Sequence, residues 1–174
     1  MTELMDAPDV APVRTRTVEW EDPTVVAAQA AGRSGLEFVR AIASGELPPP
    51  PIAVLLGMGI ESAEEGTVTF TLDVGEHLYN PIGSMHGGVY ATILDSAMGC
   101  AVQTSLAAGQ GYTTVDLTTY YVRGVTVAVP RLRIEGTVVS LGRRVATATG
   151  RVVDDAGTLY AHGSTTCLIM GTPT

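Results

Sequence analysis

No lysine occurs in this chain of 174 residues: all ten basic residues are arginine, set against 18 acidic ones. The net charge of −8 repels nucleic acid and anionic membrane surfaces, so neither is an expected partner. Aromatic residues reach only 5% and charged residues 16%, whereas hydrophobic residues make up 45%. This balance excludes a disordered chain and predicts one domain with an aliphatic core.

Cysteine is also scarce. Cys100 and Cys167 lie in apolar runs without metal-ligand spacing, which predicts reduced, buried thiols rather than a structural disulfide. The longest apolar runs contain polar residues and are too short to span a membrane. Glu3 and Asp6 precede any apolar stretch, a pattern unlike a signal peptide, so we expect a cytoplasmic protein.

Arginine is distributed unevenly. Residues 123–153 contain six arginines and one acid, Glu135, so this stretch carries +5 while the rest of the chain carries −13. Two interpretations stay open: solvated strand faces, or a site for a phosphorylated ligand, since arginine binds phosphate through two parallel hydrogen bonds. The six are Arg123, Arg131, Arg133, Arg143, Arg144 and Arg151.

The N-terminal third divides into two parts. Residues 1–22 are rich in Pro, Thr and acids and lack hydrophobic periodicity, which predicts a flexible acidic tail. In residues 23–51, Ser34 and Glu37 have capping-box spacing ahead of a helix expected over residues 35–44. A proline run at 48–51 must be extended. The main domain is expected over residues 52–174, beginning with a short apolar turn or helix.

Alternating and helical patterns then predict an α+β domain. Residues 67–73 alternate strictly between polar and apolar side chains, which indicates a half-buried strand. A segment over about 87–105 is apolar on most of its circumference, so we expect a nearly buried helix. Antiparallel strands around one central helix give the α+β class. Further strands are expected at 112–123, 129–140, 143–153 and 158–169, the last two joined by a hairpin turn at 154–157.

Two features near the start of the predicted helix point to chemistry. His86-Gly87-Gly88 lies where a loop enters the helix, and glycines there let a ligand approach the unpaired first amides. Those amides form a site for an oxyanion or a carbonyl group. Asp95 lies in the middle of the apolar helix, where a carboxylate is either paired with a strand or partner subunit, or functional.

The stretch from Asn80 to Asp95 resembles the signature of the PaaI-type hotdog thioesterases. In that family an Asn is followed six residues later by His-Gly-Gly, and Asp or Glu follows nine residues after the His. Asn80, His86 and Asp95 match both intervals. The resemblance covers about residues 52–170. It implies a hotdog fold, a curved antiparallel sheet wrapped around one long helix, and hydrolysis of acyl-CoA thioesters with aromatic or short-to-medium acyl groups.

The resemblance also implies residue roles. Asp95 acts as the nucleophile or as the general base on water, and the Gly87 amide polarises the thioester carbonyl. Asn80 positions the water or the thioester, and His86 orients the loop. Thr114 matches the hydroxyl of the following strand that assists in some members.

The arginine-rich stretch supplies candidates for the CoA phosphates, and we prefer Arg143 and Arg144 because a turn between strands can reach solvent. No metal or redox cofactor is expected, because the histidines are too scattered for a convincing metal site. They are His77, His86 and His162.

A physical argument independently favours a dimer. Gly87 and Asp95 lie about two helical turns apart, roughly 10 Å or more along the axis. One carbonyl group needs both within about 3–4 Å. Two antiparallel helices across a twofold axis satisfy this by pairing Gly87 of one subunit with Asp95 of the other. Proteins resembling this one form such dimers, commonly arranged as tetramers.

Three alternatives remain at this point. One is a hotdog hydratase or dehydratase, whose acid/base pair lies in a different local pattern from His-Gly-Gly. Another is a non-catalytic acyl-CoA-binding protein, a class that tends to lose the carboxylate retained here as Asp95. The third concerns the helix of the N-terminal extension, which either regulates the mouth of the site or simply extends the packing.

Overall fold

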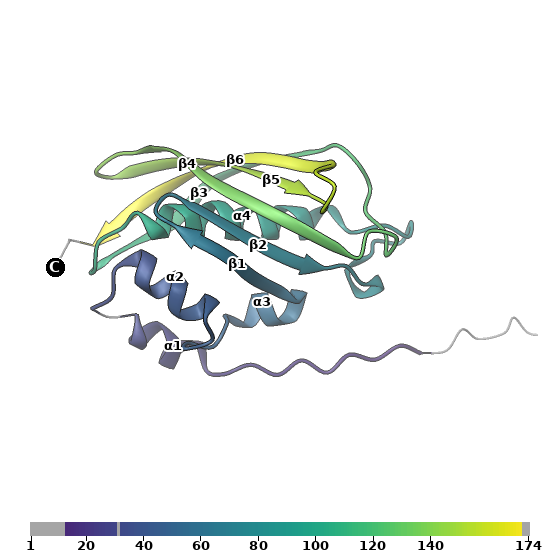
Figure 1. Cartoon of the computed structure of the whole chain (residues 1–174), viewed down its shortest axis with the longest axis horizontal. Coiled ribbons are helices and arrows are strands. Elements are labelled where there is room, and N and C mark those ends of the chain that lie inside the picture. The colour runs from purple at the N-terminus through teal and green to yellow at the C-terminus, as the bar shows by residue number, and fades with distance from the viewer. Residues whose placement is uncertain (1–12, 31, 172–174) are drawn as a thin grey trace, which may run out of the picture.

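The computed structural model describes residues 13–30 and 32–171, and it is built on one six-stranded sheet (Figure 1). The strands lie in the order β1-β2-β4-β5-β6-β3, and all neighbours are antiparallel. The sheet curves around one long helix, which confirms the predicted α+β class and the hotdog arrangement. The strands are β1 (Met58–Glu64), β2 (Thr67–Asp73), β3 (Gln110–Tyr121), β4 (Arg131–Leu141), β5 (Val145–Val153) and β6 (Leu159–Gly171).

The central helix is α4 (Gly87–Thr104), in agreement with the prediction over 87–105. Its inward face is fully excluded from solvent against the sheet. At Gly136 the backbone of β4 lies very close to the backbone of α4. A Cβ atom at this position would lie 2.8 Å from the amide nitrogen of Met98 and would overlap the Ala97 carbonyl. The fully buried residues of this helix are Ile93, Leu94, Ala97, Met98, Ala101 and Val102.

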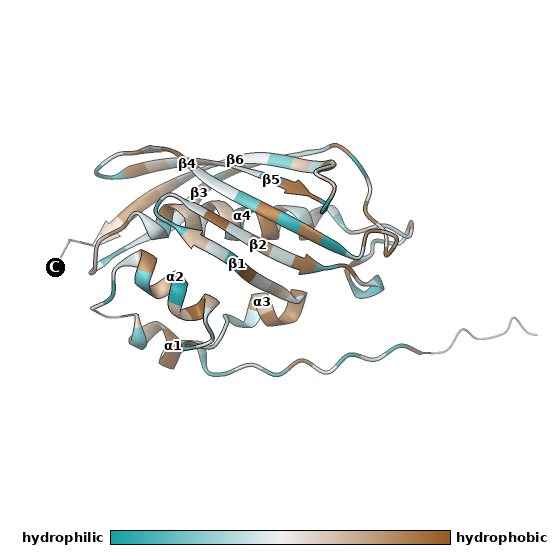
Figure 2. Ribbon diagram, viewed as in Figure 1, coloured by the Kyte–Doolittle hydropathy of each residue, from teal (hydrophilic) through white to brown (hydrophobic). Residues whose placement is uncertain are grey.

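Strand alternation sorts the side chains between the core and solvent. In β4, Leu132 and Ile134 are buried while Arg131 is exposed, and Figure 2 shows the corresponding teal and brown bands along this strand. The predicted turn after β5 is present. Asp154 accepts hydrogen bonds from the amides of Ala156 (3.0 Å) and Thr158 (2.8 Å), which closes the β5–β6 hairpin.

The N-terminal region contains the helices α1 (Pro23–Gln29), α2 (Gly35–Ala43) and α3 (Pro51–Leu56). The predicted capping box of α2 is confirmed: the Ser34 hydroxyl accepts from the Glu37 amide at 3.3 Å, and the Glu37 carboxylate accepts from the Ser34 amide at 2.8 Å. α2 packs against β1 and α4. The extension therefore closes the open side of the core near the C-terminal end of the central helix.

Three elements were not predicted: the helix α1, the strand β1 and the short 3-10 helix η1 (Glu76–Leu78). The strand has weak alternation, with a bulge between Ile60 and Ser62 and an exposed Glu61, so it lacks the period of a half-buried strand. Its pairing with β2 decides its conformation. The helix α1 has seven residues, too few to produce a clear hydrophobic period, although Asp22 caps it through the Thr24 amide.

The predicted flexible tail, residues 1–22, lies partly outside the described residues. Residues 13–22 form neither helix nor strand, and they run beneath α3 in the view of Figure 1. Within them, residues 14–18 contact the domain and are named the strap. Arg14 forms an ion pair with Glu76 at 2.6 Å, and a guanidinium NH2 of Arg16 donates to the Val54 carbonyl at 3.3 Å.

Two surfaces beside the helix are open to solvent in the single chain. The outer edge of β3 has no neighbouring strand, and Val115 on that strand is 60% exposed. The expectation that α4 is almost wholly buried holds for its inward faces but not for one strip, where Thr92, Asp95 and Ser96 are only half-buried. Thus the predicted catalytic carboxylate reaches solvent on the same side as the free sheet edge.

Candidate active site

The start of α4 is shaped by His86 and the two glycines that follow it. His86 is the N-cap residue, and its Nδ1 accepts a hydrogen bond from the Gly88 amide at 2.8 Å. This hydrogen bond occupies one free amide of the first turn and holds the imidazole in place. The Gly87 amide has no acceptor among the described residues. The helix therefore offers one open N–H donor at its positive end, suited to a carbonyl or oxyanion.

Asn80 stabilises the loop that leads into this turn. Its side-chain oxygen accepts from the amides of Ile82 (3.0 Å) and Ser84 (3.3 Å), and its NH2 donates to the Ser84 hydroxyl at 3.2 Å. Gly83 has a positive φ of 82°, which the tight turn requires. In this arrangement Asn80 shapes the loop before the helix, so its predicted role in positioning water or thioester remains a prediction.

Asp95 and Thr114 meet in space, although a turn separates their elements. The Thr114 hydroxyl on β3 donates to Asp95 Oδ1 at 2.8 Å, and both residues are half-buried. This charge-assisted hydrogen bond orients one carboxylate oxygen and leaves the other available to act on a substrate or water. The structure therefore brings together the predicted catalytic carboxylate and the hydroxyl predicted to assist it.

Three groups close enough to be affected by the charge of Asp95 are themselves uncharged at neutral pH: Cys100, Tyr112 and Cys167. Burial raises the pKa of the Cys100 thiol to about 12, and the negative charge of Asp95 adds to the effect. Burial likewise raises the pKa of Tyr112 and of Cys167. Tyr112 packs against the helix at Gly99, which has no side chain to obstruct it. Sequence reasoning did not place Cys100 or Tyr112 here, because both contacts depend on how β3 crosses the helix.

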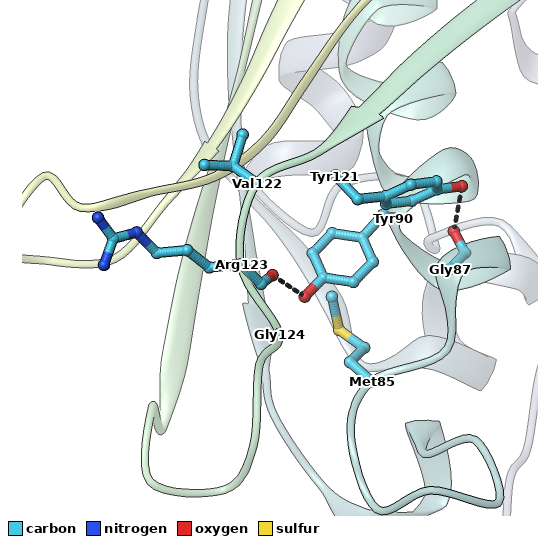
Figure 3. Close-up of a pocket in the computed structure, with 7 residues that line it drawn as sticks. All are labelled: Met85, Gly87, Tyr90, Tyr121, Val122, Arg123 and Gly124. Atoms are coloured by element: carbon cyan, nitrogen blue, oxygen red, sulfur yellow. Dashed lines mark hydrogen bonds between the residues drawn. The ribbon is translucent and has the colours of Figure 1, made fainter.

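Gly87 borders a pocket of about 290 Å³ between the helix start and the end of β3 (Figure 3). The Tyr121 hydroxyl donates to the Gly87 carbonyl at 3.2 Å, and the Tyr90 hydroxyl donates to the Arg123 carbonyl at 3.0 Å. The two tyrosine rings meet edge to face with centroids 5.7 Å apart. Figure 3 shows the Arg123 side chain extending away from the two rings. The pocket is lined by Met85, Gly87, Tyr90, Tyr121, Val122, Arg123 and Gly124.

A second pocket, of about 400 Å³, lies beside the same turn against the strap. His86 and Val89 form its wall on the side of the central helix, and Arg16 contributes from the strap. The turn at His86–Gly88 is therefore flanked by two cavities. The remaining lining residues are Val18, Leu55, Leu56, His77 and Leu78.

Three of the six clustered arginines form ion pairs across the exposed face of the sheet. These pairs are Arg131–Asp73 (3.0 Å), Arg133–Glu61 (2.6 Å) and Arg151–Glu135 (3.7 Å). For these three arginines the solvated strand face accounts for the charge. Ion pairs so exposed contribute about 0–1 kcal/mol each.

Arg143 and Arg144 lie in the turn between β4 and β5 and have no ion pair within the described part of the chain. Two hydrogen bonds link this end of the sheet to the last turn of α4. The Val138 amide, near the end of β4, donates to the Gly66 carbonyl, and the Gly66 amide donates to the Thr104 hydroxyl in α4. The β4–β5 turn therefore lies at the opposite end of the helix from Gly87 of the same chain. Arg123, by contrast, lies at the Gly87 end.

The separation of Gly87 and Asp95 agrees with the distance expected from the sequence. Both are on α4, eight residues apart, which corresponds to about 12 Å along the helix axis. A single carbonyl group cannot contact both within one chain.

Within the described ranges 13–30 and 32–171, no three His, Cys, Asp or Glu side chains are grouped as a metal site would require. In the same ranges, no helix is both long and apolar enough to cross a membrane.

Comparison with known proteins places these features in a family. The family model described as the thioesterase superfamily matches residues 82–161. A candidate esterase of Halobacterium salinarum is 33% identical over 112 residues, which are 62% of this chain and 72% of that protein. A solved structure of a protein from the thioesterase superfamily is also 33% identical, with 79% of this chain and 100% of that chain covered and a TM-score of 0.65.

The E. coli PaaI protein, from the phenylacetic acid degradation operon, has the same fold. It is 21% identical, the match covers 81% of this chain and 100% of that chain, and the TM-score is 0.69. The chain therefore belongs to the thioesterase superfamily and has its hotdog fold. It is a thioester hydrolase.

Proposed function

We propose that this protein hydrolyses acyl-CoA thioesters to a free acid and CoA, at sites formed between two subunits. Asp95 is the carboxylate that attacks the carbonyl carbon or removes a proton from the attacking water. The Gly87 amide of the other subunit polarises the carbonyl. The observation that carries the proposal is the pairing of Asp95 with Thr114 on the open strip of α4, together with the unoccupied Gly87 amide.

A symmetric dimer follows from the two open surfaces. If β3 of one chain pairs antiparallel with β3 of a second chain, the unpaired N–H and C=O groups of both edges are satisfied. The same twofold axis brings two central helices together along their half-buried strips, which contain Asp95. Gly87 of one helix then lies opposite Asp95 of the other, which removes the separation of about 12 Å within one chain.

Chemical steps follow from this geometry. The thioester carbonyl accepts a hydrogen bond from the Gly87 amide, and negative charge developing on its oxygen is stabilised by the helix terminus. Asp95 attacks the carbonyl carbon to form an anhydride that water then opens, or it takes a proton while water attacks directly. In both routes the C–S bond breaks and the CoA thiolate leaves to be protonated by solvent. Thr114 holds the carboxylate throughout, and no metal or redox cofactor takes part.

Several features favour a CoA ester. In an antiparallel dimer, the end of one chain that carries Arg143 and Arg144 lies toward the Gly87 end of its partner. These arginines have no ion pair among the described residues, and they are our candidates for the CoA phosphates. Arg123, beside the Gly87 pocket, is a further candidate. Aromatic and short-to-medium aliphatic acyl groups are both open.

The direct test is thiol release from a panel of acyl-CoAs by the wild type, Asp95→Asn and Asp95→Ala. We expect both variants to lose at least about a hundredfold in kcat, a typical contribution for a positioned acid or base. Asp155→Asn is the matched control, since Asp155 lies exposed in the β5–β6 turn. Full turnover without the Asp95 carboxylate would refute the mechanism. Binding without thiol release in the wild type would favour a hydratase or a binding protein.

Complementation tests whether the site is shared. Gly87→Pro removes the amide hydrogen at the first helical position, where proline fits, and His86 already has the extended backbone that precedes proline. Gly87→Ala keeps the amide and is the control. Mixed dimers of Asp95→Asn and Gly87→Pro chains contain one intact site, so random mixing should restore about a quarter of wild-type activity. No recovery in verified mixed dimers would place both groups in one chain's site.

A further inference from the structure

The strap, residues 14–18, forms one wall of the pocket beside His86. His86, the residue before Gly87, and Val89 of the first helical turn line this pocket of about 400 Å³, so it lies beside the helix start where the thioester carbonyl is proposed to bind. The strap lies outside the residues 82–161 that match the family model. Because the strap is not part of the matched family region, it can give this protein a preference for a particular acyl group while the hydrolytic residues stay the same.

The pocket is lined mostly by aliphatic side chains and is polar where it borders a neighbouring surface pocket. Val89 and Leu78 supply aliphatic surface, whereas Arg16 and His77 line the part that the pocket shares with a neighbouring surface pocket. An aliphatic chain suits the first part and a hydrogen-bond acceptor suits the second. The lining therefore fits an acyl group with an apolar stem and a polar end.

The positive charge of Arg16 determines which polar group at the end of an acyl chain can bind in this pocket. Its guanidinium donates one hydrogen bond, to the Val54 carbonyl at 3.3 Å, and it has no ion pair within the described residues. It lines both this pocket and the neighbouring surface pocket. The nearby carboxylate of Glu76 is compensated by Arg14 at 2.6 Å. A guanidinium without an ion pair, at the edge of a mostly aliphatic pocket, favours a carboxylate, which accepts two parallel hydrogen bonds.

His77 stands beside Arg16 as a neutral partner. Burial and the positive charge of Arg16 both lower its pKa, so at pH 7 it donates or accepts hydrogen bonds without adding a second charge. The polar end of the pocket thus has one permanent cation.

We propose that Arg16 selects thioesters whose acyl group ends in a carboxylate, so that the preferred substrates are ω-carboxyacyl thioesters. This inference rests on the proposed function, because the pocket serves the acyl group of the thioester hydrolysed at Gly87 and Asp95. The carboxylate of the acyl group binds the Arg16 guanidinium, its methylene stem packs along Leu78 and Val89, and its thioester carbonyl reaches the helix start.

The experiment compares two CoA thioesters of equal chain length, adipoyl-CoA and hexanoyl-CoA, by initial rates of thiol release from the full chain. Because Arg16 is exposed, its ion pair with a carboxylate contributes about 0.2–1 kcal/mol, which converts to a preference of up to about fivefold in kcat/KM for adipoyl-CoA. Arg16→Leu should reduce this ratio to near one, and Arg16→Lys should retain part of it because the charge remains.

A control separates charge recognition from simple release of the strap. The double variant Arg14→Leu/Glu76→Gln removes the other anchor of the strap without leaving an unpaired carboxylate, and it should keep the wild-type ratio. An equal loss of selectivity in this control would overturn the role of the guanidinium. Efficient hydrolysis of both esters with a ratio near one in the wild type overturns this inference alone. Absence of thiol release from every acyl-CoA overturns the proposed function with it.

Discussion

Replacement of Gly136 by alanine tests how closely the sheet contacts the central helix. Gly136 lies in β4, where the strand crosses α4, and an added Cβ would lie 2.8 Å from the Met98 amide nitrogen and overlap the Ala97 carbonyl. The atoms it meets belong to helix backbone, which cannot rotate away as a side chain can. The strand or the whole helix must therefore move.

The magnitude follows from two opposing effects. Added volume in a tightly packed core costs about 1–3 kcal/mol, and a backbone collision belongs at the upper end. Alanine also has less backbone freedom than glycine in the unfolded chain, which raises the free energy of unfolding by about 0.4–1 kcal/mol. The free energy of unfolding should therefore fall by about 2 kcal/mol. For a chain of this size that lowers Tm by about 4–8 °C.

Thermal and urea unfolding, followed by circular dichroism, measure this loss. The protomer concentration must be matched between samples, because Tm depends on it for an oligomer. Gly111→Ala is the control: this glycine is also in a strand and its added Cβ would meet nothing within 4 Å. We expect the control not to lower Tm, and to raise it by about 1–4 °C through the same loss of freedom in the unfolded chain. Equal Tm values for the two variants would show that sheet and helix are not in such close contact.

Two further predictions concern the neighbourhood of Asp95. Thr114→Val keeps the side-chain shape but removes the 2.8 Å hydrogen bond to Asp95, so kcat for thiol release should fall about tenfold or more while Thr114→Ser stays near wild type; a fully active valine variant would exclude a positioning role. With a pKa of about 12, Cys100 is ionised to about one part in a thousand at pH 9, where an ordinary thiol of pKa 9.0 is half ionised. Iodoacetamide at pH 9 should therefore label Cys100 at least about a hundredfold more slowly in the native protein than after unfolding in urea, as mass spectrometry would reveal, and equal labelling rates would contradict the raised pKa.

Local patterns in the sequence determined the fold class and the position of the candidate site. Alternation over 67–73 predicted β2, and the intervals from Asn80 through His86 to Asp95 predicted a helix start and a carboxylate two turns later. The capping box at Ser34 was equally readable. Each of these signals lies within a few residues of chain, because helix caps, strand periods and helix faces are set by near neighbours.

Tertiary structure alone decided the partners of those residues. The hydrogen bond between Thr114 and Asp95, the pairing of Arg133 with Glu61 and the contact of Arg16 with Val54 join residues 19, 72 and 38 positions apart. Strand register and helix crossing create such contacts, and neither leaves a local period in the sequence. For the same reason β1 was not predicted, because its alternation is weak and it forms a strand only through pairing with β2. The sequence by itself thus determined which groups can react, and the packing of distant segments decided which groups surround them.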